Sequence, residues 1–147
     1  MSHIVVCRLD PPGKEFEPLD CWLMEYFCDD VSCDCRFVAL DAVANQVPDE
    51  ILASIHLGWE SVEFYQARTG CDREAAERFR AGCLDLANPG LDWAEAVLVE
   101  LRKEVFSDPK VLTRFRRHYE IFRRELRRRE RTLSRRGSSS ARPRASS

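Results

Sequence analysis

Three cysteines lie close together in the segment Tyr26-Phe-Cys28-Asp-Asp-Val-Ser-Cys33-Asp-Cys35-Arg36. The residues between Cys28 and Cys33 are polar and favour a turn, so this segment can fold back on itself. Cys33 and Cys35, two positions apart, share one side of an extended backbone, and Cys28 can approach them across the turn. Three thiolates at about 2.3 Å from one ion would match the geometry that zinc prefers. The spacing therefore predicts a structural metal site with zinc as the ion.

Redox chemistry and simple packing are the alternatives for these cysteines. The chain has seven cysteines, an odd number, and it opens without the basic start and apolar stretch of a secretory signal. No run of about 18 apolar residues predicts a membrane span. We therefore expect a cytoplasmic protein with reduced thiols, for which a disulfide scaffold is the weaker explanation. The neighbouring Asp29, Asp30 and Asp34 argue against a redox role, because negative charge raises a thiol pKa.

The cluster itself does not supply a fourth ligand. His118 is the first candidate, followed by His56 and then by Cys21 or Cys7. A histidine on an apolar helix face can equally be a packed, hydrogen-bonded core residue. Water in the fourth position would make the site catalytic, but no partner carboxylate is evident from the sequence.

The predicted secondary structure that positions these residues differs between two parts of the chain, with strands in the first and helices in the second. Alternating and β-branched runs, separated by turn residues, predict four strands in the first 58 residues: His3–Leu9, Cys21–Cys28, Arg36–Val43 and Ile51–Leu57. For Cys21–Cys28 a strand is favoured, although its periodicity alone also fits a buried helix. The last two strands form a hairpin whose loop contains Pro48. The sequence then changes to helical periodicity, with stop and cap residues at each end. The predicted helices are Ser61–Arg68, Asp72–Ala81, Asp92 to about Val105, and a long one from Ser107 or Asp108 to about Leu133.

The long last helix carries one apolar stripe and a face that is almost entirely arginine. The stripe comprises Val111, Leu112, Phe115, His118, Tyr119, Phe122 and Leu126. We expect an α+β fold, in which a small and mostly antiparallel sheet is followed by three or four helices, the last one long and basic. Residues 1–133 would form a single zinc-stabilised domain, and residues 134–147 a disordered tail rich in serine and arginine.

Charge is distributed unevenly along the chain. Residues 1–101 contain 7 Lys/Arg and 20 Asp/Glu, a net −13, whereas residues 102–147 contain 16 Lys/Arg and 5 Asp/Glu, a net +11. The basic end could bind an acidic protein partner, the phosphates of a nucleic acid or an anionic membrane surface, and the glutamates among the arginines also allow a solvated helix face. A protein partner is favoured, because no nucleic-acid motif is present and the body is acidic.

Three segments resemble a bacterial protein family of uncharacterised function. They are the cysteine segment given above, Ile55-His-Leu-Gly58-Trp59-Glu60-Ser-Val-Glu-Phe-Tyr65, and Arg117-His118-Tyr119. The resemblance covers roughly residues 20–124, and it implies that Cys28, Cys33, Cys35 and His118 form one ligand set. Some members carry an added SEC-C metal-binding motif, which this chain lacks. Ile55-His-Leu-Gly also departs from the family's commoner Ile-Ser-Tyr-Gly, which argues against His56 as a required ligand.

The sequence contains no established catalytic signature. A Ser-His-Asp order, a P-loop, a glycine-rich dinucleotide motif and His-Glu-x-x-His are all missing. The favoured function is therefore a zinc-stabilised intracellular interaction or adaptor module. An arginine-mediated nucleic-acid-binding protein is the alternative, and a metal- or thiol-dependent enzyme is a weaker one.

Overall fold

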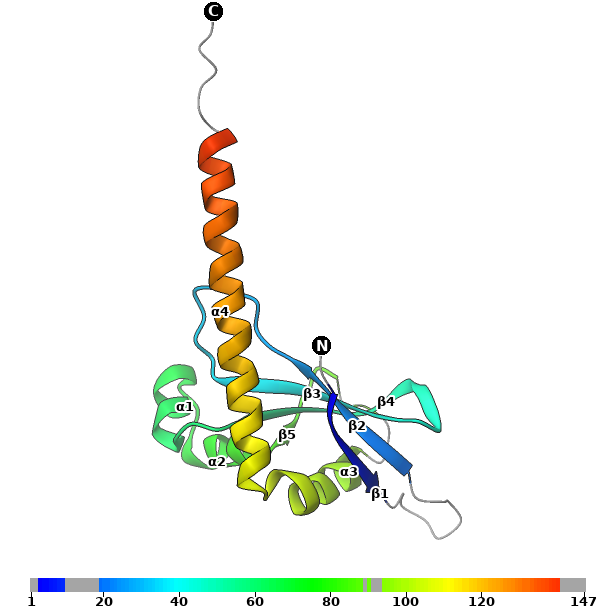
Figure 1. Cartoon of the computed structure of the whole chain (residues 1–147). Coiled ribbons are helices and arrows are strands. Elements are labelled where there is room, and N and C mark those ends of the chain that lie inside the picture. The colour runs from blue at the N-terminus through cyan, green and yellow to red at the C-terminus, as the bar shows by residue number, and fades with distance from the viewer. Residues whose placement is uncertain (1–2, 10–18, 89, 91–93, 141–147) are drawn as a thin grey trace, which may run out of the picture.

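A computed structural model describes residues 3–9, 19–88, 90 and 94–140 (Figure 1). Within these residues, five strands form one antiparallel sheet in chain order. The strands are β1 (His3–Leu9), β2 (Leu19–Tyr26), β3 (Phe37–Ala44), β4 (Val47–Gly58) and β5 (Cys83–Leu84). The predicted α+β fold with an antiparallel sheet in the first half of the chain is confirmed. The two-residue β5, which pairs with β4, was not predicted.

The hairpin between β3 and β4 is tighter than the sequence suggests. Only Asn45 and Gln46 separate the two strands, because β4 begins at Val47 and continues through Pro48. Proline is tolerated there because the strand register shifts: Ala44 pairs with Val47 and Val43 with Ile51, which leaves the residues between them outside the ladder. A proline at such an irregularity costs no hydrogen bond between the strands.

Helices α1 (Val62–Thr69) and α2 (Arg73–Ala81) follow β4 and lie together beside the sheet (Figure 1). Both begin where the sequence predicted, because the side chains of Ser61 and Asp72 accept hydrogen bonds from backbone N–H groups of the first turn. Gly58, at the end of β4, has no room for a side chain, because a Cβ atom there would collide with the hydroxyl group of Tyr65. This close approach lets α1 fold back onto the end of β4.

The predicted third helix is divided into two segments. Helix α3 (Ala94–Leu101) is followed by the π-helix η1 (Arg102–Phe106), and the two form a continuous connection to the last helix. Asp92, the expected N-cap, lies outside the described residues. Leu101, Val105 and Phe106 are buried, so the wider π turn keeps an apolar face toward the sheet.

Helix α4 (Pro109–Ser140) crosses the body of the protein and then extends beyond it (Figure 1). It begins at the predicted proline, and the side chain of Asp108 accepts a hydrogen bond from the backbone N–H of Lys110. It continues seven residues beyond the expected end at Leu133; residues 141–147, the rest of the expected tail, lie outside the described part. The predicted apolar stripe is buried or half-buried along its length.

The main core lies between the sheet and the α3–α4 segment. Alternate residues of β3 are buried, as expected for a sheet covered on one face. They pack with residues of β2 and β4, with α3 and η1, and with Phe115 of α4. A second cluster joins α1 to α2 around Tyr65. The loop between β2 and β3 therefore emerges where the sheet, α1 and α4 meet.

Candidate metal centre

The loop between β2 and β3 carries the three clustered cysteines. Its turn is built by Asp30, whose carboxylate accepts hydrogen bonds from the backbone N–H and the hydroxyl group of Ser32. The carbonyl oxygen of Asp30 accepts a further bond from the N–H of Cys33, at 3.0 Å. This local pairing is typical of aspartate in turns. It reverses the chain so that Cys33 returns toward Cys28.

The ligand atoms of Cys28, Cys33 and Cys35 all lie within 4.8 Å of one another. The three side chains are half-buried and none is in a disulfide. Sulfurs around a tetrahedral zinc ion lie about 3.8 Å apart, given a zinc–sulfur distance of about 2.3 Å. The spacing of the three sulfur atoms is therefore compatible with one shared ion. The predicted convergence of these three cysteines is confirmed, and the group could hold a metal ion.

The surroundings of the thiols shift the pKa values of Cys33 and Cys35 in opposite directions. Burial acts to raise the pKa of Cys33, but hydrogen bonds from Arg68 and from the neighbouring thiols outweigh it and lower that pKa. The Arg68 guanidinium, on α1, lies 3.5 Å from the Cys33 sulfur. Burial and the adjacent Cys33 raise the pKa of Cys35 to about 12. A divalent cation would favour the thiolate form at all three positions.

Helix α4 holds the loop in place through two buried side chains. Arg123, only 4% exposed, donates from Nη1 to the carbonyl oxygen of Asp30 and from Nη2 to that of Val31, both at 2.7 Å. The Tyr119 hydroxyl donates to the Asp34 carboxylate at 3.1 Å and accepts from the backbone N–H of Arg36 at 3.3 Å. The cysteine loop is thus fixed to α4 on both sides of Cys33.

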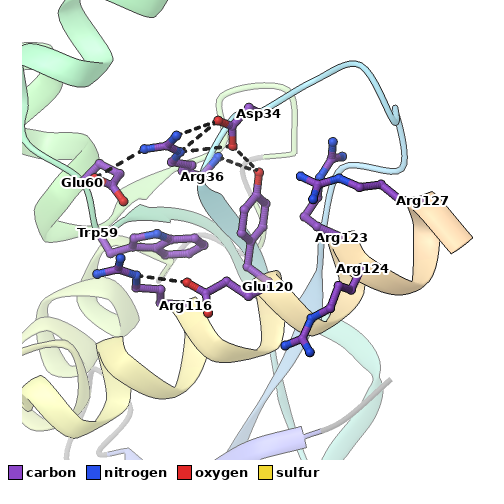
Figure 2. Close-up of a pocket in the computed structure, with 10 residues that line it drawn as sticks. Asp34, Arg36, Trp59, Glu60, Arg116, Glu120, Arg123, Arg124 and Arg127 are labelled. Atoms are coloured by element: carbon purple, nitrogen blue, oxygen red, sulfur yellow. Dashed lines mark hydrogen bonds and ion pairs between the residues drawn. The ribbon is translucent and has the colours of Figure 1, made fainter.

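Asp34 and Arg36 close the loop with a bidentate ion pair (Figure 2). The Arg36 guanidinium, with a further bond from Tyr119, holds the pKa of Asp34 below its usual value. Burial raises the pKa of Tyr119 to about 12, so its hydroxyl remains protonated and able to donate. The carboxylates of Asp30 and Asp34 are therefore both engaged in holding the loop.

His118 lies on α4 one position before Tyr119, but it is not part of the sulfur group. Its Nδ1 lies 3.0 and 3.1 Å from the two carboxylate oxygens of Glu25, a residue of β2 that is 3% exposed. The structure therefore shows a histidine–carboxylate pair that the sequence did not suggest. His118 as a metal ligand remains a prediction.

The other suggested ligands have different surroundings. His56 lies 3.6 Å from the Asp85 carboxylate and packs against the rings of Phe37 and Phe79. Cys21 is fully buried in β2, and its register partner in β1 is Cys7. Neither His56 nor Cys21 joins the group of three cysteines.

Sequence reasoning missed Arg68 and Arg123 as residues that support the cysteine loop. Arg123 follows Tyr119 by four positions and Phe115 by eight, so it continues the buried stripe of α4. That periodicity was a usable signal, which the surrounding arginines obscured. No comparable signal existed for Arg68, because its contact with Cys33 spans 35 positions.

No family model, curated protein or solved structure matches this chain. In the part of the chain that the structure describes, no helix has the length and apolar character needed to cross a membrane.

Proposed function

We propose that this chain is a zinc protein in which Cys28, Cys33 and Cys35 hold a structural ion. The observation that carries the proposal is the approach of three free sulfur atoms to within 4.8 Å of one another. Soft thiolate ligands favour zinc over magnesium, calcium or manganese. The ion would close the loop between β2 and β3, which packs against both α1 and α4.

His118 is our proposal for the fourth ligand. Metal-binding histidines usually form a hydrogen bond with a carboxylate through their second ring nitrogen, which fixes the ring orientation. Glu25 provides such a carboxylate at Nδ1 of His118, and Nε2 is the nitrogen that would face the metal. Because His118 is outside the sulfur group, zinc binding would have to move the loop and the imidazole toward each other.

We propose a protein-interaction role for the zinc-stabilised fold, with α4 as the contact element. The helix extends beyond the body, and every side chain from Arg127 to Arg136 is exposed. The net charge of +11 in residues 102–147 suits an acidic protein partner. In this interpretation the metal holds the cysteine loop, which contacts α4 at Tyr119 and Arg123. The exposed part of α4 beyond these contacts binds the partner.

Elemental analysis tests the metal. Protein purified without added zinc should contain about one equivalent, and Cys33→Ser should lose both the ion and thermal stability. Cys83→Ser is the matched control, because Cys83 is a half-buried cysteine in β5 outside the cluster. It should keep its zinc. A wild-type protein that holds no metal and titrates as free thiols would contradict the proposal.

His118→Ala tests the fourth ligand separately. After replacement of zinc by cobalt(II), the wild type should show a tetrahedral spectrum with thiolate charge-transfer bands. His118→Ala should alter the ligand-field bands while the thiolate bands remain. Zinc affinity should also fall, by about 10- to 100-fold or more. An unchanged spectrum and unchanged affinity would remove His118 from the ligand set and leave the three cysteines.

A further inference from the structure

A cavity of about 580 Å³ lies between α4 and the ends of β3 and β4 (Figure 2). Two aromatic side chains, Trp59 and Tyr119, line it and contact each other edge to face, with ring centroids 5.2 Å apart. Five of the residues around it are arginines: Arg36, Arg116, Arg123, Arg124 and Arg127. Its volume is within the range of sites that bind small molecules.

Carboxylates in the cavity neutralise two of these arginines. Arg36 pairs with Asp34 at 2.8 Å and lies 3.8 Å from Glu60. Arg116 pairs with Glu120 at 3.4 Å. These pairs account for all three carboxylates that line the cavity, so the acidic side chains there are already matched.

The other three arginines have no such partner. Among the described residues, no carboxylate lies within ion-pair distance of Arg123, Arg124 or Arg127. Arg123 and Arg127 are four positions apart on α4, a spacing at which like charges repel. Figure 2 shows both side chains projecting from α4 toward the side where Asp34 and Arg36 lie, whereas Arg124 projects the other way. The cavity therefore has unbalanced positive charge.

At Arg123 the unbalanced positive charge is energetically unfavourable, because this side chain is removed from water. Its side chain is more than nine-tenths buried, and its two Nη atoms bind only backbone carbonyl oxygens. Its Nε is buried and has no hydrogen-bond partner in the structure. A buried charge is normally paired, because desolvation without a counter-charge is unfavourable. The charge of Arg123 acts on the Asp30 carboxylate only from beyond ion-pair distance, and an anion in the cavity would add a counter-charge in direct contact.

We propose that this cavity binds a phosphate group, either as free phosphate or as the phosphomonoester of a small organic molecule. Guanidinium groups match phosphate oxygens with paired, charge-assisted hydrogen bonds, and Arg127 is the exposed arginine placed to make them beside Arg123. The aromatic wall leaves room for an organic group next to the phosphate. The indole N–H of Trp59, which has no partner among the described residues, is a further donor.

The proposal does not depend on the metal. The metal content of the complete chain is measured first, and the same protein is then titrated with the phosphate ligands. A failure of the metal proposal is thereby distinguished from a failure of the phosphate proposal. Inorganic phosphate and adenosine monophosphate serve as the ligands, in a buffer free of phosphate and sulfate, with binding followed by calorimetry. Saturable binding of at least one of them is expected.

Arg127→Glu is the test variant, and Arg135→Glu is its matched control. Both residues are exposed arginines of α4, and both substitutions change the net charge equally, but Arg135 does not line the cavity. Arg127→Glu should weaken phosphate binding by about tenfold or more, since it removes a charge-assisted contact and adds a like charge. Arg135→Glu should leave the affinity within about twofold.

The two ligands distinguish the source of the phosphate. Tighter binding of adenosine monophosphate identifies an organic phosphate, and equal binding identifies free phosphate. Absence of saturable binding at millimolar concentrations of both would overturn the proposal. An equal loss of affinity in the two variants would also overturn it, because the attraction would then belong to the whole basic helix.

Discussion

The first and last parts of α4 have the same helical backbone and opposite surroundings. Between Val111 and Leu126 the helix packs against the sheet and the cysteine loop, and Phe115, Tyr119 and Arg123 are buried. From Arg127 to Arg136 every side chain is exposed. Tertiary packing explains the first part. The second must rely on helix propensity and on pairs between neighbouring turns, and arginine is a good helix former.

This difference shows that arginine has two distinct roles in one helix. Arg123 binds two loop carbonyl oxygens and is part of the folded body. The guanidinium groups of Arg128 and Arg129, one to two turns later, bind Glu125 on their own helix. Composition alone does not separate these roles. The position of each arginine relative to the apolar stripe does.

The largest expected effect comes from Phe115→Ala. Phe115 is fully buried in the main core, and removal of a buried phenyl ring typically costs about 3–5 kcal/mol of unfolding free energy. Leu133→Ala makes a similar truncation in the exposed part of α4, where Leu133 is 62% exposed. It should change stability by less than about 0.5 kcal/mol. Urea unfolding measures both. A comparable loss in Leu133→Ala would show that the distal part is packed in solution.

Arg123→Met should have the next largest effect. The substitution keeps an unbranched apolar stem but removes the guanidinium, so the carbonyl oxygen of Val31 loses its donor and that of Asp30 keeps only the N–H of Cys33. A loss of about 2 kcal/mol is expected, because hydrogen bonds made by a charged group contribute more to stability than neutral ones. Arg131→Met, on the exposed part of the helix, is the control and should be close to neutral in the same unfolding measurement. Unchanged or increased stability of Arg123→Met would mean that desolvation of its charge costs as much as its hydrogen bonds contribute.

Local sequence signals predicted most of the fold. Ser61, Asp72 and Pro109 each marked a helix start that the structure confirms, because capping depends on residues within one turn. The β3–β4 loop was less predictable. A proline usually interrupts a strand, but the register shift near Val43 accommodates Pro48, and such a shift depends on pairing between strands.

The candidate metal site was predictable only in its local part. Cys28, Cys33 and Cys35 lie within eight residues, so turn chemistry alone brings them together. The supporting contacts come from Arg68 on α1 and Arg123 on α4, which are distant in sequence. The pairing of His118 with Glu25 joins residues 93 positions apart and depends on how α4 packs against β2. Residue spacing carries no information about such contacts.

The smallest expected effect concerns Glu125, at the boundary between the two parts of α4. Hydrogen bonds from Arg128, assisted by its charge and by Arg129, lower the pKa of Glu125 below its ordinary value of 4.5. The folded protein therefore binds this proton more weakly than the unfolded chain does. The stabilisation is complete above the unfolded pKa and is lost as the pH falls through the lowered, folded value.

Glu125→Gln removes this titration while nearly preserving the shape of the side chain. At neutral pH the wild type should be slightly more helical than the variant by circular dichroism, and added salt should reduce the difference because the pairs are exposed. Once the pH has fallen below the lowered pKa of Glu125 in the folded protein, the two proteins should converge, since protonated glutamate and glutamine make similar contacts. A difference that persists in acid would assign the role of Glu125 to packing of its aliphatic stem. A difference that is absent at every pH would show that the distal helix is maintained by propensity alone.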